Sequence, residues 1–473
     1  MRRRPAHRPL IVTAAAVASI IGLVLGRFGW GTDYRVLLVL LGMLIATWRS
    51  RLWWLPLLVL GLGLGLWRAE SYRLAQAILT DRIGATITVT GTVVDDPLVN
   101  DKNQSDYRVG ALKLDGHTIV GIIRIKSTPV RLLRGYKVAL SGTLESGFAT
   151  WNGSLFYPQL TILSTSQSVL ERVRQNFFIG IRSALPEPEA SFGLGLLVGV
   201  GGLIPKPLQL ELTRVGLSHL VAVSGYNLTI IIRLVSRLLS GLGRNVALVL
   251  SIWLIGVFVV LSGASSSIVR AGVVSILSLL AAHAGRHVQP LVLTCVAAAG
   301  TALFSPAYLN DIGWLLSFLA FFGILVVAPA IMERFGEPKL VLGRMVIETL
   351  AAQLLTLPLI VGVFSQLSII SLVANVVVEP FVPLAMLASL AAGLIGLWLP
   401  LWGDLLAAPS AFLLGLILKI ISALAALPWA MTSTGLPVPE MIACYVVIAG
   451  FTYALARANR RRQRARFAIL DTR

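Results

Sequence analysis

The sequence predicts a mainly α-helical, polytopic membrane protein with one small extracellular β-barrel of the OB type. Of its 473 residues, 56% are hydrophobic and 13% are charged, whereas soluble domains contain about 25% charged residues. The apolar residues form long blocks such as 245–264, and about 20 of them suffice for a helix to cross a bilayer. Residues 81–166 differ, because polar and apolar side chains alternate there with the period of a β-strand.

The apolar blocks determine how many membrane spans are expected. Three precede the barrel and nine follow it: 10–29, 34–48, 52–67, 217–239, 245–262, 266–284, 289–304, 312–332, 343–364, 381–399, 404–427 and 439–457. Counting the further block 367–380 would put the arginine-rich tail outside, against the preference of Lys and Arg for cytoplasmic segments. We therefore predict about twelve spans plus a re-entrant half-helix at 367–380, with both termini in the cytoplasm and the barrel outside.

The barrel is expected from several short strands. Residues 110–127 form two of them, joined at Asp115-Gly116, a pair typical of hairpin turns. Further strands are predicted at 85–97, 136–146 and 155–164. About five short strands in so few residues favour an OB-like barrel. Nine Lys and Arg oppose seven Asp and Glu over 81–166, so a strongly basic nucleic-acid surface is not expected.

The chain thus divides into five segments. They are the N-terminal helices (1–70), the β-domain (81–166), an amphipathic interfacial helix (168–185), a membrane domain (190–457) and a basic cytoplasmic tail (458–473). The formal charge of +19 is explained largely by basic cytoplasmic segments.

Little in the sequence indicates catalysis. Residues 222–225, Ala-Val-Ser-Gly, resemble the nucleophile motif of rhomboid intramembrane proteases, with His219 or His283 as the base. However, His219 and Ser224 would lie about 140° apart on a helix, so they would not face each other. The chain has no Gly-Lys dipeptide and hence no P-loop, and its five histidines show no metal-binding spacing. We predict no catalytic residues, no metal and no cofactor, and therefore not an enzyme.

Polar residues inside the apolar blocks are the strongest functional signal. An ionisable group at the bilayer centre costs roughly 2.5–3.5 kcal/mol on insertion scales, so several such groups indicate a hydrated path or a buried polar network. Each alone could simply bond a neighbouring helix. The predicted pore or gate residues are His219, Ser224, Asn227, Arg270, Gln353 and Asn375, and the predicted structural network is Asp311 and Glu379.

Four stretches together resemble one family. They are GLSHLVAVSGYN (216–227), SSIVRAGVV (266–274), NDIGWLLSFLAFFGIL (310–325) and AAQLLTLPLIVGVFSQLSIISLVANVVVEPFVP (351–383). In order and spacing they resemble blocks of the ComEC-type competence proteins, which are bacterial inner-membrane channels for DNA uptake. The departures are Asn227 in place of a usual His and Trp314-Leu315 in place of Phe-Gln. We also expect a variant without the C-terminal metallo-β-lactamase-like domain of many members, and hence no nuclease role.

The resemblance implies a passive channel for single-stranded DNA in the cytoplasmic membrane during natural transformation. The implied partners are single-stranded DNA, membrane lipids, and a separate DNA receptor, nuclease and motor ATPase. In the β-domain, stacking and phosphate pairing would fall to Tyr107, Arg108, Lys113, Arg124 and Lys126, although a rigid spacer is an equal alternative. The other functional alternative is a transporter of another anionic or lipid-linked substrate.

Overall fold

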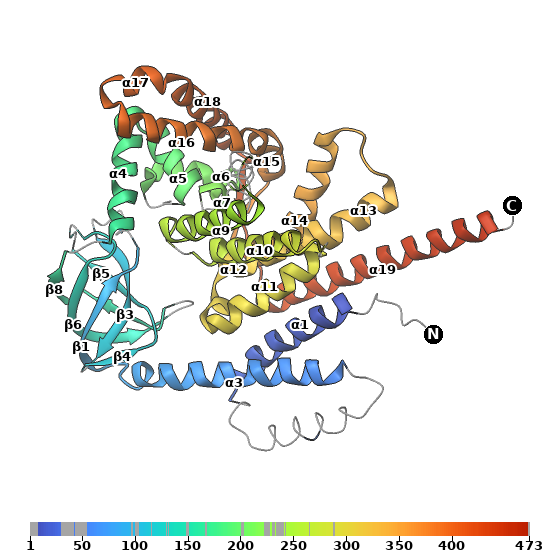
Figure 1. Cartoon of the computed structure of the whole chain (residues 1–473), viewed down its shortest axis with the longest axis horizontal. Helices are drawn as coiled ribbons and strands as arrows, with labels where there is room; N and C mark the ends of the chain where they lie inside the picture. Colours follow the sequence, from blue (N-terminus) through green and yellow to red (C-terminus); the bar gives the residue numbers. More distant parts are fainter. Residues whose placement is uncertain are drawn as a thin grey trace. The chain divides into compact units, whose positions relative to one another are not determined.

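The computed structural model divides the chain into two compact units, Met1–Phe178 with Ser224–Trp314 and Ile179–Val223 with Leu315–Arg473. Figure 1 shows the course of the chain. The residues that the structure describes are 8–29, 42, 54–95, 98–99, 104–114, 116–128, 130, 132–147, 151–165, 168–199, 203–221, 228, 232, 241, 243–263, 265–286 and 289–471.

In the described part of the first unit, five long helices precede or follow the barrel in the sequence. They are α1 (Arg8–Gly26), α3 (Leu55–Thr80), α9 (Arg244–Leu261), α10 (Ser266–His283) and α11 (Pro290–Phe304), and the short helix η3 (Pro306–Asn310) follows them. The α1 and α3 backbones approach so closely that a Cβ atom at Gly65 would lie 2.2 Å from the carbonyl oxygen of Ser19. Glycine is therefore required at this crossing, because any side chain would push the two helices apart.

The β-domain is a closed barrel. Its strands are β1 (Thr86–Val93), β2 (Leu98–Val99), β3 (Ser105–Leu114), β4 (His117–Ile119), β5 (Ile123–Ser127), β6 (Lys137–Ser146), β7 (Gly153–Phe156) and β8 (Gln159–Ser164). Neighbouring strands follow the order β1-β3-β5-β7-β6, and β6 pairs with β1 to close the ring. All of these pairs are antiparallel except β5 with β7. The five-stranded ring confirms the predicted OB-like barrel, and β3 and β4 form the predicted hairpin around Gly116.

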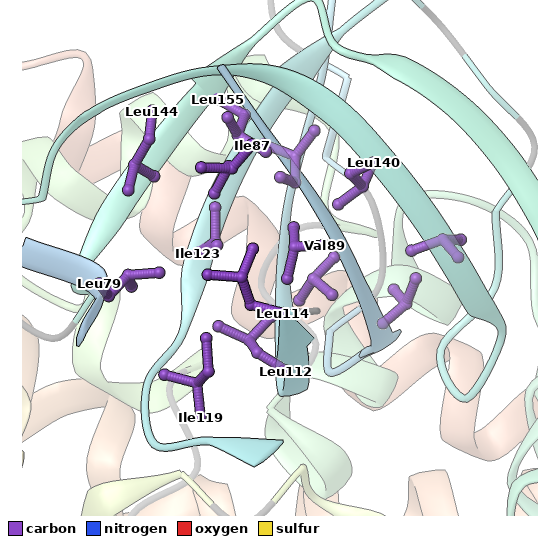
Figure 2. Close-up of a cluster of buried hydrophobic side chains, with 14 of the residues drawn as sticks. Leu79, Ile87, Val89, Leu112, Leu114, Ile119, Ile123, Leu140, Leu144 and Leu155 are labelled. Atoms are coloured by element: carbon purple, nitrogen blue, oxygen red, sulfur yellow. The ribbon is translucent and has the colours of Figure 1, made fainter. Parts of the chain in front are cut away.

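The barrel core is built mainly of aliphatic side chains, with every strand of the ring contributing, and Figure 2 shows part of this cluster. One comes from outside the barrel: Leu79, near the end of α3, is completely buried in this cluster. Strand β3 contains a bulge, because Thr90 pairs with Lys113 whereas Thr92 pairs with Gly110. The bulge reverses which residues of β3 point inward, since an extra residue shifts the alternation of faces.

Helix α4 (Val169–Ala184) follows the barrel. The sequence predicts an amphipathic helix whose aliphatic residues lie on a membrane surface. This stays a prediction, and the buried side of the helix contains an ion pair, with 2.8 Å between Arg174 Nη1 and Glu171 Oε1. The Arg174 guanidinium also lies 4.5 Å from the ring centroid of Phe178. Val169 and Val173, in contrast, are exposed.

The second unit consists of helices and one small sheet. Its elements are α5 (Glu189–Val198), α6 (Lys206–Arg214), α7 (Ser218–Val221), α13 (Ala328–Phe335), α14 (Val341–Phe364), β9 (Gln366–Ser368), α15 (Ser371–Val378), η5 (Glu379–Phe381), α16 (Val382–Trp398), η6 (Pro400–Trp402), α17 (Gly403–Leu406), α18 (Ala408–Ala425), β10 (Met431–Ser433) and α19 (Val438–Asp471). Helix α12 (Ile312–Phe322) and η4 (Gly323–Val327) lead into α13. Strands β9 and β10 pair antiparallel.

Seven helical segments in the described part of the chain are long and apolar enough to cross a membrane. They are Pro9–Gly26, Arg244–Leu261, Ile312–Phe335, Val341–Phe364, Ser371–Trp398, Ala408–Ala425 and Val438–Arg462. Two further predicted spans correspond to α10 and α11, which are shorter apolar helices. The chain is therefore a polytopic membrane protein with a small barrel, as predicted.

Three of the predicted features need comment, either because the structure does not describe them or because it differs from the prediction. Most of 34–48 and most of 217–239 lie outside the described residues. Helix α3 is longer than the predicted span 52–67 and contains Arg68, Glu70 and Arg73. The predicted half-helix corresponds to β9 and α15, but α15 continues through η5 into α16, so that 371–398 is one helical run.

Candidate nucleic-acid interface

One face of the barrel combines basic and aromatic side chains. It is formed by β3, β5 and β7, which are neighbours in the sheet. Alternation along these strands turns Arg108, Arg124, Lys126 and Phe156 outward, while Ile123 and Ile125 point into the core. Strand pairing places Arg124 opposite Arg108 and Lys126 opposite Phe156. We call Arg108, Arg124, Lys126, Trp151, Phe156 and Tyr157 the aromatic–basic face.

The aromatic rings of this face lie against its cations. The guanidinium carbon of Arg124 is 4.9 Å from the ring centroid of Trp151, and Lys126 Nζ is 5.4 Å from the centroid of Phe156. Phe156 and Tyr157 are 43% and 56% exposed. Exposed rings beside cations are the groups on which single-stranded bases stack while their phosphates are neutralised.

The backbone fixes the position of these rings. The Tyr157 amide donates to the carbonyl oxygen of Lys126 at 2.7 Å, and Tyr157 has a φ of 51°, which turns the chain after β7. Its hydroxyl accepts a hydrogen bond from Gln104. Trp151 precedes Asn152, whose side-chain oxygen accepts from the Ile122 amide at 2.9 Å. Trp151 is thus fixed near the start of β5 and β7, and Phe156 and Tyr157 are fixed near the ends of these strands.

Two carboxylates partly neutralise the face. Arg108 pairs with Asp95, and Arg124 pairs with Asp106. The hydrogen bond to Asp106 raises the pKa of Arg124. Both ion pairs are partly exposed, and such pairs contribute about 0–1 kcal/mol. A phosphate could therefore replace either carboxylate at little energetic cost, since Arg binds both in the same two-pronged manner.

Three of the five predicted contacts come together on this face, namely Arg108, Arg124 and Lys126. Lys113 is also exposed, but it lies beyond the β3 bulge and pairs with β1 and β4. The prediction for Tyr107 is wrong, because its side chain is only 1% exposed and belongs to the barrel core. Burial raises the pKa of Tyr107 to about 12.

Sequence reasoning missed the three aromatic residues. Trp151 and Tyr157 lie just outside β7, in positions where period-two alternation carries no information about exposure. The signal that could have found them is the composition of the segment, because three aromatic residues fall within 151–157. This segment contains β7, the neighbour of the basic strand β5 in the sheet.

Part of the predicted pore set forms a second cluster, in the second unit. Gln353 Nε2 donates to Ser371 Oγ at 3.3 Å, and Asn375 Nδ2 donates to the Ser371 carbonyl oxygen at 2.8 Å. Asn375 is 5% exposed, and its Oδ1 atom has no hydrogen-bond partner in the described part of the chain. The cluster therefore retains an acceptor for a polar ligand or water.

The α6–α7 turn contacts this cluster. Gly216 has a φ of +73°, and a Cβ atom there would lie 2.6 Å from Ser371 Cβ. His219 Nδ1 is 3.2 Å from the Gly216 carbonyl oxygen. His219, Gln353 and Asn375 are thus connected through Gly216 and Ser371. Ser224 and Asn227 lie outside the described residues.

The remaining candidates have separate surroundings. Arg270 is 2% exposed on α10. Asp311 Oδ1 accepts from the Trp314 amide at 2.9 Å and so caps α12, while the Trp314 indole donates to Thr301 Oγ1 at 3.1 Å. Glu379 begins η5, one turn after Asn375. We also predict from the sequence that most of the eight groups converge on one cavity beside 367–380, and this stays a prediction.

The fold and these two polar sites define a class: a polytopic membrane protein with an OB-like barrel and polar groups within its membrane helices. Residues 196–460 match the model of the family described as "Competence protein", which is more than half of the chain. The chain therefore belongs to the competence protein family, as the sequence resemblance predicted.

One curated relative is similar to about half of this chain. It is ComE operon protein 3 of Bacillus subtilis (strain 168), 28% identical over 225 residues. The alignment covers 47% of this chain and 28% of that relative, so the chain matches well under two thirds of the relative's length. No solved structure matches the chain.

Proposed function

We propose that this protein is a passive channel that conducts single-stranded DNA across the cytoplasmic membrane during DNA uptake in natural transformation. The observation that carries the proposal is the family match over residues 196–460. Those residues include the Gln353–Ser371–Asn375 cluster, where a buried acceptor is left for a polar ligand. Burial of so many polar groups is justified where water or a polar cargo replaces their lost hydration.

The aromatic–basic face would receive the strand before it enters the membrane. Stacking on Trp151, Phe156 and Tyr157 requires unpaired bases, because the bases of a duplex already stack on each other. The face therefore suits a single strand better than a duplex. Its small net charge favours weak binding, which lets a strand move onward.

The driving force has to come from elsewhere. Moving one negative charge inward against a membrane potential costs about 2.3 kcal/mol per 100 mV, and a strand carries one charge per nucleotide. The 473 residues contain no Gly-Lys dipeptide and hence no P-loop. We accordingly assign no enzymatic activity to the chain and expect a separate DNA receptor, nuclease and motor ATPase.

The test is complementation of a strain that lacks the gene. Labelled duplex DNA is supplied, and label that becomes resistant to external nuclease is measured. The full chain should restore uptake, whereas Gln353→Leu and Asn375→Leu should lower it at equal membrane insertion. Thr356→Val is the matched control, because among the described residues the Thr356 hydroxyl bonds only within α14, to the carbonyl oxygens of Ala352 at 3.0 Å and of Gln353 at 3.4 Å. Uptake that persists without the gene would refute the proposal.

A further inference from the structure

Helix α19 has one face packed against the protein. The Tyr445 hydroxyl donates to the Leu355 carbonyl oxygen at 3.0 Å, and the Asn459 amide donates to the Ala330 carbonyl oxygen at 2.9 Å. Leu455, between them on the same side, is buried. These contacts fix the rotation of α19 about its axis, and so they determine which residues point away from the protein.

The opposite face changes character along the helix. Ile442, Val446 and Tyr453 are exposed at 56%, 66% and 69%. At the same helical spacing of three and four residues, the next exposed residues on this face are Arg457, Arg460 and Arg461, which we call the arginine stripe. Along this face, exposed apolar side chains are therefore followed first by a tyrosine and then by the arginine stripe.

The distances along the helix match the layers of a bilayer. The segment Val438–Arg462 is long and apolar enough to span a membrane, and tyrosine concentrates at the boundary between acyl chains and headgroups. With a rise of 1.5 Å per residue, the arginine stripe begins about 6 Å beyond Tyr453 and ends about 12 Å beyond it. The polar layer of one leaflet is about 5–7 Å thick, so long arginine side chains reach its phosphates from either side.

We propose that the arginine stripe of α19 is a binding site for the phosphate groups of anionic phospholipids. Residues 457–466 contain six arginines and no acidic residue, and a guanidinium binds phosphate through two parallel hydrogen bonds. The occupant is a lipid rather than a nucleic acid, because the stripe continues the lipid-facing side of a membrane helix. Asn459, on the packed face, donates from Nδ2 to Glu333 Oε2 of the neighbouring α13 at 3.4 Å.

The experiment compares phosphatidylglycerol with phosphatidylcholine. The full-length protein is purified in detergent, and bound lipid is measured by native mass spectrometry during titration with each lipid. The triple variant Arg457→Gln, Arg460→Gln, Arg461→Gln should bind phosphatidylglycerol more weakly by about fivefold per arginine. Its affinity for phosphatidylcholine and its melting temperature should not change, since the three side chains are exposed.

The matched control also removes three positive charges, but from the barrel region rather than from α19. Arg82, Lys113 and Lys137 are exposed on or next to the barrel, and changing all three to Gln should leave phosphatidylglycerol binding intact. A variant with Lys at the three stripe positions should keep most of the affinity. Equal losses in stripe and control variants would overturn the proposal. So would stripe-dependent binding of a single-stranded oligonucleotide that displaces phosphatidylglycerol.

Discussion

At the scale of single residues, the rings of the aromatic–basic face lie against its cations. Arg124 lies against Trp151 and Lys126 against Phe156, so the rings and cations hold each other in place. Side chains that are already ordered lose less conformational entropy when a ligand binds. The aromatic rings should therefore contribute more to binding than the exposed ion pairs.

The first prediction concerns these rings. Trp151→Ala and Phe156→Ala should each weaken the binding of an oligothymidylate to the full-length protein, by about 1–3 kcal/mol per lost stacking platform. Fluorescence anisotropy at fixed salt measures the effect. Leu163→Ala is the control, since Leu163 is an exposed apolar residue on β8 rather than on this face. If all three variants bind alike, the barrel is a spacer.

The second prediction concerns the buried Tyr107. Its pKa is raised from 10 to about 12, so its un-ionised form is favoured by folding. This contribution to stability is complete below pH 10 and is lost as the pH rises through about 12. The loss amounts to about 2–3 kcal/mol. Tyr107→Phe should therefore flatten the fall in melting temperature over this pH range, and a parallel fall in both proteins would contradict the assignment.

The residues of this face were only partly predictable. Alternation places Arg108, Arg124 and Lys126 on one side of the sheet. The same alternation should have put Tyr107 inside, beside the inward-pointing Val109. What the pattern hides is the bulge near Ala111, whose φ of 50° interrupts the alternation in the middle of β3. The local sign of that position is Gly110, since a glycine inside a strand often marks a bulge.

At the scale of elements, the turn between α6 and α7 packs against the start of α15. Gly216 is enclosed by Ser368 and Ser371, and Ser368 Oγ donates to the Arg214 carbonyl oxygen at 2.8 Å. These contacts join two of the sequence blocks that carry the family resemblance. Their shared polar cluster therefore depends on a close backbone approach.

The third prediction tests that approach. Gly216→Ala combines an unfavourable positive φ with a clash against Ser371, so the melting temperature of the full-length protein should fall clearly. Gly285→Ala is the matched control, because Gly285 has a φ of +66° but no atom within 4 Å of an added Cβ. It should cost only the backbone term of about 1–2 kcal/mol. Equal effects of the two substitutions would show that the contact with Ser371 is unimportant.

Most helices were predictable because long apolar blocks have few alternatives in a membrane. The exception is the region 367–398. Counting positive charges led to a separate half-helix, yet α15, η5 and α16 form one helical run. Pro380 and Pro383 lie in the first turns of η5 and α16, the two segments that follow α15, and proline is tolerated in a first turn.

At the scale of the whole molecule, the open question is which way the chain crosses the membrane. The fourth prediction places the barrel outside and the C-terminus in the cytoplasm, as the distribution of arginines requires. In a background with Cys295 and Cys444 changed to Ser, a cysteine at exposed Thr118 should react with an impermeant maleimide in intact cells. A cysteine at Thr472 should react only after lysis, and labelling of both in intact cells would contradict the prediction.

The burial of Leu79 in the barrel has a consequence for the stability of this domain. Helix α3 begins at Leu55 and runs unbroken to Thr80, about 39 Å in length, so the residue that completes the barrel core is delivered by a helix that starts 24 residues earlier in the chain. A fully buried leucine contributes about 1.5–3 kcal/mol. The barrel core is therefore complete only when the last turn of α3 packs against it. The stability of the domain is thereby coupled to the position of the helix that precedes it.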